Sequence, residues 1–175
     1  MYAVGDCTQY VEFVTGKSVP IGLGSIAVRQ GIAAGINASG GDYELPEGVL
    51  QTATSEFFNI EIASVGPSYQ SRQDLNTVFA KHNGLSKPEY FPGGKPITMK
   101  AIVEQKTGNV IAAQAVGENA AQRINTYATA ILSKMHIDTF KKLETAYAPP
   151  IAPTLDVVTL VADVVSYKWL RKNKN

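Results

Sequence analysis

The chain contains 175 residues, of which 45% are hydrophobic and 18% are charged, and its formal net charge is +1. This length fits one domain, or one domain and part of another, and it excludes an enzyme with two complete dinucleotide-binding domains. The charged fraction is below the roughly 25% that is usual for soluble domains, so we expect apolar surface that a second subunit covers.

The charge balance and the apolar segments exclude two classes of partner. A net charge of +1 does not provide the basic surface that binds nucleic acid. The best membrane candidate, residues 157–165, is short and contains Asp163. The start of the chain has no signal-peptide pattern, and a single cysteine, Cys7, cannot form an internal disulfide. We therefore expect a cytoplasmic protein without nucleic-acid or membrane partners.

The first 48 residues have the pattern of the end of a structural unit. Residues 1–5 are apolar and run into Gly5-Asp6, which predicts a strand that ends at a tight turn, with the structure before it absent. A helix is predicted from Ile26 to about Asn37, with Gly24 or Ser25 as its N-cap. The turn-rich residues 40–48 predict a connection to a second unit.

The remaining residues predict an α+β fold, with an antiparallel sheet and helices packed on one side. Strands are predicted at residues 56–63, 77–82, 97–105 and 109–116. The last two form a hairpin through Lys106-Thr107-Gly108, and the second of them is apolar on both faces, which indicates a central strand. Helices are predicted at residues 118–135, 138–144 and 155–172, the last capped by Thr154.

Gly5 and Asp6 are the first candidate binding residues. A strand that ends in Gly-Asp places a carboxylate at the edge of a sheet, where it can accept hydrogen bonds from ribose or ribityl hydroxyls, and glycine lets a ligand approach the backbone. Taken alone, this pair is more often a simple turn. About fifteen residues later, however, a glycine-rich segment opens a helix with small residues on one face.

The two segments, YAVGDC and PIGLGSIAVRQGIAAG, together resemble the second flavin-contacting motif of the FAD- and NAD(P)H-dependent disulfide reductase superfamily. The resemblance implies that Asp6 binds a hydroxyl of the FAD ribityl chain and that the backbone of Leu23 and Gly24 binds the pyrimidine edge of the flavin. The partial positive charge at a helix N-terminus would stabilise the electron-rich pyrimidine of a reduced flavin. FAD is then the cofactor of the full-length enzyme, and NAD(P)H is its substrate.

Residues 56–171 resemble the C-terminal dimerisation domain of the same superfamily, in its NADH oxidase and coenzyme A-disulfide reductase branch. The motifs that carry this resemblance are YFPG at residues 90–93, AVG at 115–117 and AYAPP at 146–150. In coenzyme A-disulfide reductases, two tyrosines of one subunit reach the redox cysteine and flavin of the other, and by motif position these are Tyr90 and Tyr147. The resemblance implies catalytic roles for both. A tyrosine beside proline can also simply anchor a loop, and this alternative stays open.

Other parts of the family pattern are missing from the chain. There is no G-x-G-x-x-G fingerprint for FAD or NAD(P)H, and no N-terminal redox cysteine. Cys7 directly follows Asp6, so we expect it to be a buried thiol without a catalytic role. Two histidines and one cysteine form no close cluster, and we expect no metal site.

These patterns lead to one hypothesis and one alternative. The hypothesis assigns residues 1–48 to the end of an FAD-binding domain and residues 49–175 to a dimerisation domain. The chain would then be a homodimer that lacks N-terminal FAD and NAD domains and does not turn over alone. The alternative is a self-standing dimerisation or interaction module without redox activity. Oxygen, coenzyme A disulfide and polysulfide all remain open as electron acceptors, as do NADH and NADPH as donors.

Overall fold

The computed structural model describes residues 1–20 and 22–174, so that Ile21 of the PIGLGS segment lies outside the described part. Its main element is a five-stranded antiparallel sheet with the strand order β3-β4-β7-β6-β5. The strands are β3 (Ala53–Phe57), β4 (Ile60–Val65), β5 (Thr77–Leu85), β6 (Pro96–Glu104) and β7 (Val110–Gly117). The predicted central position of β7 is confirmed.

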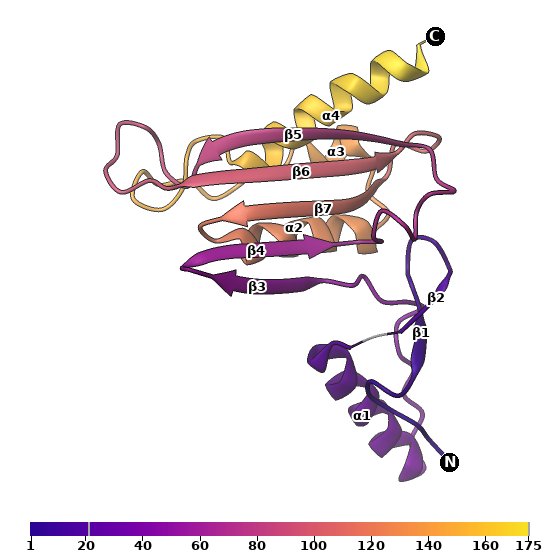
Figure 1. Ribbon diagram of the computed structural model, residues 1–175. Coiled ribbons are helices and arrows are strands. Elements are labelled where there is room, and N and C mark those ends of the chain that lie inside the picture. Colours follow the sequence, from indigo (N-terminus) through magenta and orange to yellow (C-terminus); the bar gives the residue numbers. More distant parts are fainter. Residues whose placement is uncertain (21, 175) are drawn as a thin grey trace.

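Three helices lie on one face of this sheet (Figure 1). They are α2 (Ala120–Leu132), the short α3 (Ile137–Phe140) and α4 (Val157–Asn173). Helix α2 packs on β4 and β7, while α4 packs on β5, β6 and α3. The predicted α+β architecture, with helices on one side of an antiparallel sheet, is therefore confirmed. None of the described helices is long and apolar enough to cross a membrane.

The predicted hairpin between β6 and β7 is confirmed. Its turn contains Gly108, whose φ of +72° favours glycine, and a Cβ at this position would lie 2.2 Å from His136 Nε2. Thr107 Oγ1 donates a hydrogen bond to Glu104 across the turn at 2.5 Å. The tight turn of the hairpin therefore contains the residues that its geometry requires, a glycine with positive φ and a threonine that bonds across the turn.

The single strand predicted at residues 56–63 is wrong, because the chain reverses direction in its middle. Phe58 and Asn59 have φ values of 51° and 62°, and they form the two-residue turn between β3 and β4. Asn tolerates this left-handed conformation, but a bulky Phe adopts it rarely. Apolar residues alternate at Phe58, Ile60 and Ile62, on both sides of the turn, so the sequence pattern gave no sign of the reversal.

The core lies between the sheet and its helices, and Tyr127 on α2 is at its centre. This side chain is fully buried, and its Oη donates a hydrogen bond of 2.9 Å to the carbonyl of Val158 in the first turn of α4. Its ring packs edge-on against Phe140 at 4.6 Å between centroids. Burial raises the pKa of Tyr127 well above its ordinary value, so the hydroxyl stays protonated and keeps donating.

The helix starts differ from the predicted ones by one or two residues. Helix α4 begins after Asp156, whose carboxylate accepts from Val158 N–H at 3.0 Å, rather than after Thr154. Helix α3 begins after His136, whose Nδ1 accepts from Asp138 N–H at 3.1 Å, and it ends at Phe140 rather than near Glu144. Several residues in each segment could serve as a cap, and tertiary contacts decide among them.

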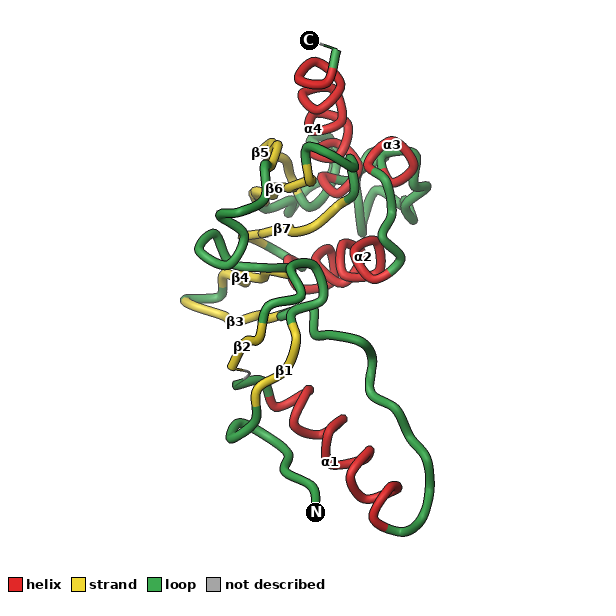
Figure 2. The backbone as a smooth tube through the Cα atoms, turned by 90° about the vertical axis from the view of Figure 1, so that its right-hand side faces the viewer, coloured by secondary structure: helices red, strands yellow, loops and turns green. Residues whose placement is uncertain are grey.

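The N-terminal unit lies beyond the β3 edge of the sheet (Figures 1 and 2). It consists of the two-stranded β1 (Gln9–Val11) and β2 (Ser18–Pro20), followed by α1 (Gly24–Ala38). Residues 40–48 form neither helix nor strand and return to the sheet. At the end of this return, Val49 N–H donates to Val11 O at 2.8 Å, and Phe13 N–H donates to Val49 O at 3.0 Å.

The strand predicted at residues 1–5 is wrong. These residues pair with no strand in the described part of the chain, and Tyr2 and Val4 are exposed. A strand needs a neighbour for its backbone N–H and C=O groups, and apolar composition cannot replace that neighbour.

The start of α2 is capped by a side chain from the sheet. Asn119 precedes the helix in a left-handed conformation, with φ of 57°, and its own side chain does not cap it. Instead, the carboxylate of Glu61 on β4 accepts from the N–H groups of Ala121 at 3.1 Å and Asn119 at 3.3 Å. This carboxylate also lies at the positive end of the helix dipole.

Replacing Glu61 with alanine is expected to lower the free energy of unfolding by about 1–2 kcal/mol, because the first amides of α2 lose their acceptor. Urea denaturation measures this change. Glu56→Ala is the matched control, since Glu56 faces Glu61 directly on β3. Removing this like charge is expected to leave stability unchanged or slightly higher. Equal losses in both variants would contradict the capping role of Glu61.

Candidate functional site

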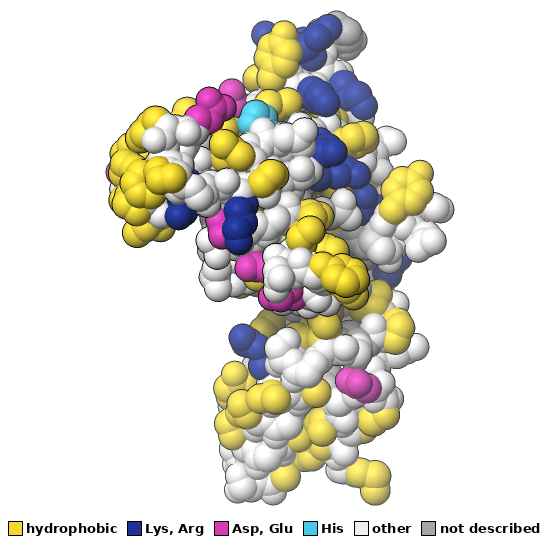
Figure 3. All heavy atoms as spheres, turned by 60° about the vertical axis from the view of Figure 1, so that its left-hand side comes forward, with side chains coloured by type: hydrophobic (Ala, Val, Ile, Leu, Met, Phe, Trp, Pro, Cys, Tyr) yellow, Lys and Arg dark blue, Asp and Glu magenta, His cyan; other side chains and the backbone are white. Residues whose placement is uncertain are grey.

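Two loops bring Tyr90 and Tyr147 together. Tyr90 lies between β5 and β6, Tyr147 lies between α3 and α4, and their hydroxyl oxygens are 2.8 Å apart. The loops project from the same end of the sheet (Figure 1), and hydrophobic side chains cover much of this end (Figure 3). Tyr90 is 71% exposed and Tyr147 is 46% exposed, with Ile151 and Leu155 also exposed nearby in sequence.

The hydrogen bond makes the two phenols unequal. It raises the pKa of Tyr90. The pKa of Tyr147 is lowered, first by the hydrogen bond with Tyr90 and then by the hydroxyl of Thr154. Tyr147 is therefore the more acidic phenol of the pair, and this direction is the one expected when Tyr90 is the donor.

The Tyr147 loop is closed by its own backbone. The N–H groups of Ile151 and Ala152 both donate to the carbonyl of Ala148, at 2.8 and 2.9 Å. Pro149 and Pro150, which lie between Ala148 and Ile151, have fixed φ angles. This turn therefore holds Tyr147 on a short, stiff projection.

At the other candidate site, Gln30 of α1 connects the Gly5-Asp6 turn to the helix. Gly5 has a φ of +87°, and its N–H donates to Gln30 Oε1 at 2.7 Å. Gln30 Nε2 also donates to the Thr8 hydroxyl at 3.1 Å, and the side chain is only 6% exposed. The carboxylate of Asp6 stays exposed beside this turn. Gln30 was not predicted as a site residue, because it follows Arg29 and the two together have the pattern of a solvent-facing helix surface.

Leu23 and Gly24 lie at the start of α1, and Leu23 is the N-cap instead of the predicted Gly24 or Ser25. No side chain caps this end, and the space where Gly24 would carry a Cβ is open. Beside Leu23, a cleft of about 450 Å³ separates Gly22 from the loop around Tyr69. Gln30 lies about 9 Å further along the helix, at 1.5 Å per residue.

These groups fit the flavin end of an FAD molecule. The amides at the start of α1 can donate to the carbonyl oxygens of a flavin pyrimidine, and Asp6 can accept from ribityl hydroxyls. The described residues provide no glycine-rich loop for the adenine end. These residues could hold the flavin end of the cofactor but not its adenine end.

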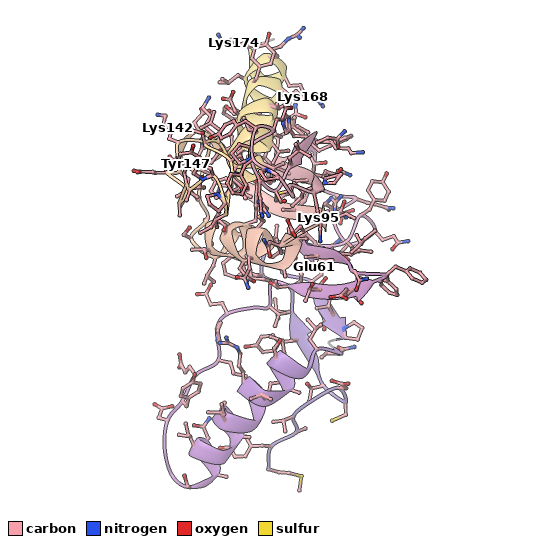
Figure 4. All side chains as sticks on the ribbon, turned by 90° about the vertical axis from the view of Figure 1, so that its left-hand side faces the viewer. Glu61, Lys95, Lys142, Tyr147, Lys168 and Lys174 are labelled. Carbon is pink, nitrogen blue, oxygen red and sulfur yellow. The ribbon has the colours of Figure 1, made fainter. Side chains whose placement is uncertain are left out.

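Within one chain, the structure does not bring the two candidate sites together. Tyr147 lies on the projecting loop beside the sheet, whereas α1 lies at the opposite end of the molecule (Figure 4). The structure brings Tyr90 to Tyr147 and joins Gly5 to Gln30 of α1, but within the described part of the chain it shows no hydrogen bond between Asp6 and Leu23 or Gly24.

The expectation of a buried Cys7 is wrong. Its thiol is exposed and donates a hydrogen bond to the Val4 carbonyl at 3.4 Å. The turn after Gly5 carries it to the surface in the absence of a strand over residues 1–5. Over residues 1–20 and 22–174, no three His, Cys, Asp or Glu side chains gather as a metal site would require.

Comparison with known proteins identifies the fold. Residues 52–158 match the family described as the pyridine nucleotide-disulphide oxidoreductase dimerisation domain. The chain belongs to this family. The resemblance that the YFPG, AVG and AYAPP motifs indicated is therefore confirmed, and proteins named NADH oxidase and coenzyme A disulfide reductase are among the matches.

Several members of the pyridine nucleotide-disulphide oxidoreductase family align with almost the whole chain. The NAD(P)H sulfur oxidoreductase (CoA-dependent) of Pyrococcus furiosus is 34% identical over 171 residues, which cover 95% of this chain and 38% of the relative. The NADH oxidase of Methanocaldococcus jannaschii is 34% identical over 166 residues, with 93% and 37% covered. The NAD-dependent persulfide reductase of A. fulgidus superposes with a TM-score of 0.91 at 36% identity, with 98% and 32% covered. The chain thus spans less than two fifths of these relatives.

The inequality of the two phenols is measurable. In a pH titration of tyrosine 13Cζ chemical shifts, Tyr147 is expected to ionise below the ordinary value of 10.0 and Tyr90 above it. In Tyr90→Phe, the pKa of Tyr147 is expected to rise, because its oxygen loses a donor. Tyr167→Phe, an exposed site on α4, is the control and leaves both values unchanged. Coincident titration of Tyr90 and Tyr147 would contradict the hydrogen bond.

Proposed function

We propose that this chain is the C-terminal part of an FAD-dependent NAD(P)H oxidoreductase of the NADH oxidase or coenzyme A-disulfide reductase type. In the whole enzyme it closes the flavin site and forms the dimer interface. Residues 1–48 belong to the FAD-binding domain, and residues 49–175 form the dimerisation domain. The observation that carries this proposal is the exposed pair of hydroxyls, Tyr90 and Tyr147, on loops that project far from α1.

The separation of the two sites supports a homodimer in which each flavin site is shared. The tyrosine pair of one subunit would lie beside the start of α1 in the other. Exposed apolar residues on the projecting loops, such as Ile151 and Leu155, suit burial against a second subunit. An isolated monomer would leave them in water.

The proposed roles of the residues follow from their chemistry. Bound FAD would supply electron transfer from NAD(P)H to the acceptor. Asp6 would hold ribityl hydroxyls, and the first amides of α1 would bind the pyrimidine edge. Tyr147, the more acidic phenol, would donate a hydrogen bond to a thiolate, persulfide or peroxide, while Tyr90 holds its oxygen in place.

The exposed surface of α1 supports a requirement for further domains. Val28, Ile32 and Ile36 form an exposed stripe at four-residue spacing, and the small-residue positions Gly31 and Gly35 are open. A preceding part of an FAD-binding domain would cover this helix. The isolated chain is therefore proposed to hold no FAD and to have no turnover.

Light scattering of the 175-residue chain at micromolar concentration is expected to give twice the mass of one chain. Ile151→Asp is expected to shift the equilibrium toward monomer, because a charge enters the proposed interface. Tyr167→Asp is the control, since Tyr167 is similarly exposed on α4, away from the projecting loops. A monomer for the unmodified chain would contradict the homodimer.

A chimera that joins the N-terminal part of the Pyrococcus furiosus relative to this chain tests the redox role. It is expected to show a flavin absorption band and to oxidise NAD(P)H with coenzyme A disulfide, polysulfide or oxygen, assayed in parallel. Tyr147→Phe is expected to lower kcat at least about tenfold, because the donor to the acceptor is lost.

Two comparisons make this assay decisive. Tyr167→Phe in the same chimera is expected to keep full activity. The 175-residue chain alone, incubated with FAD, is expected to show no bound flavin band. A bound band from the chain alone would overturn the proposed need for the preceding domains, and an unchanged kcat in Tyr147→Phe would overturn the role of Tyr147.

A further inference from the structure

A buried serine closes the base of the loop that carries Tyr90. Ser86, which is 1% exposed, donates its N–H to the carbonyl of Lys95 at 2.9 Å, and its Oγ accepts from Lys95 N–H at 2.9 Å. The same hydroxyl donates to Glu118 Oε2 at 2.5 Å. Lys95 Nζ lies 3.4 Å from the other oxygen of Glu118. Both ends of the loop are therefore tied to one carboxylate.

Glu118 is joined in turn to the base of the Tyr147 loop. Its backbone carbonyl accepts from Nη1 of Arg123 at 2.9 Å. The remaining donors of this guanidinium go to Asp156, with Nε at 2.9 Å from Oδ1 and Nη2 at 2.7 Å from Oδ2. Asp156 caps α4 at the end of the loop that carries Tyr147.

These contacts form one continuous path between the two loops. From the base of the Tyr90 loop it passes across the starts of α2 and α4 to the end of the Tyr147 loop. We name its polar members the loop-base network, which consists of Ser86, Glu118, Arg123 and Asp156. Three of the four residues, Ser86, Arg123 and Asp156, are less than 9% exposed. None of them reaches the two phenols directly.

We propose that the loop-base network positions Tyr90 and Tyr147 at hydrogen-bonding distance, so that its members are positioning residues for the redox reaction. This inference rests on the proposed function of the tyrosine pair. The two loops are 57 residues apart in sequence, and no backbone ladder joins them. Side chains at the bases of the two loops therefore contribute to their spacing.

The burial of the network explains why it can fix this spacing. A buried charge that loses its partner stays desolvated, so the Arg123–Asp156 pair holds α2 and α4 in one relative position. Ser86 is 1% exposed, so its hydroxyl cannot exchange the Glu118 carboxylate for a water molecule as its hydrogen-bond acceptor. Hydrogen bonds to charged groups are also shorter and more directional than neutral ones.

The test uses the full 175-residue chain and two readouts of the tyrosine pair that need no flavin. The first is the difference between the pKa values of Tyr90 and Tyr147, from 13Cζ chemical shifts. The second is the yield of dityrosine between these residues after brief photo-oxidation at neutral pH, from peptide mass spectrometry. In Ser86→Ala and Glu118→Leu, the pKa difference is expected to narrow, and the cross-link yield to fall about three- to tenfold, as loss of one hydrogen bond implies.

A matched control separates positioning from general stability. Ser166 is also buried, and it donates to Asp138 Oδ1 at 2.5 Å, away from the two loops. Ser166→Ala is expected to lower the melting temperature while leaving both readouts unchanged. Glu118→Gln keeps an oxygen that accepts from Ser86, and it is expected to restore most of the cross-link yield.

The outcomes divide cleanly. Unchanged readouts in folded Ser86→Ala and Glu118→Leu, or equal losses in Ser166→Ala, would overturn the positioning role. If Glu118→Leu does not fold, Ser86→Ala and the Glu118→Gln variant still provide the comparison. The positioning role can be overturned by these readouts while the chimera remains active. Conversely, an inactive chimera would overturn the proposed redox function without changing the pKa difference or the cross-link yield.

Discussion

The ion pair between Arg123 and Asp156 joins α2 to the start of α4, at the end of the loop that carries Tyr147. Arg123 lies on α2, Asp156 caps α4, and both side chains are 9% exposed. Dispersion and apolar burial alone would permit small shifts of one helix along the other, but a bidentate contact has one geometry. Tyr127 adds a second link between the same helices, through the carbonyl of Val158. These two contacts hold the end of the loop that precedes α4.

The sequence predicted those parts of the fold that depend on local patterns. Alternating side chains and a Lys-Thr-Gly turn were enough for the β6–β7 hairpin, and β7 is central because it is apolar on both faces. The turn at Phe58 was missed because its left-handed conformation is held by the pairing of β3 with β4 rather than by residue preference. The N-cap of α4 was placed at Thr154 because the partner of Asp156, Arg123, is 33 residues away.

The candidate sites divide in the same way. Gly5 and Asp6 form a local turn that the sequence shows, and the order of motifs along the chain indicated Tyr90 and Tyr147. Gln30, Glu61 and Ser86 were missed, since each contacts a segment more than 20 residues away. Gln30 follows Arg29, and Glu61 alternates with Ile60 and Ile62, so local polarity did not distinguish either residue from one on the surface.

The hydrogen bond between the two tyrosines also bears on how this chain can change in evolution. A phenol that donates to a second phenol needs both partners and both loop lengths to be kept. A substitution or insertion in one loop would leave the tyrosine hydroxyl of the other loop without its hydrogen-bond partner. Changes at positions 90 and 147 should therefore be inherited together. Across related sequences, we expect these two positions to covary more strongly with each other than with their own chain neighbours.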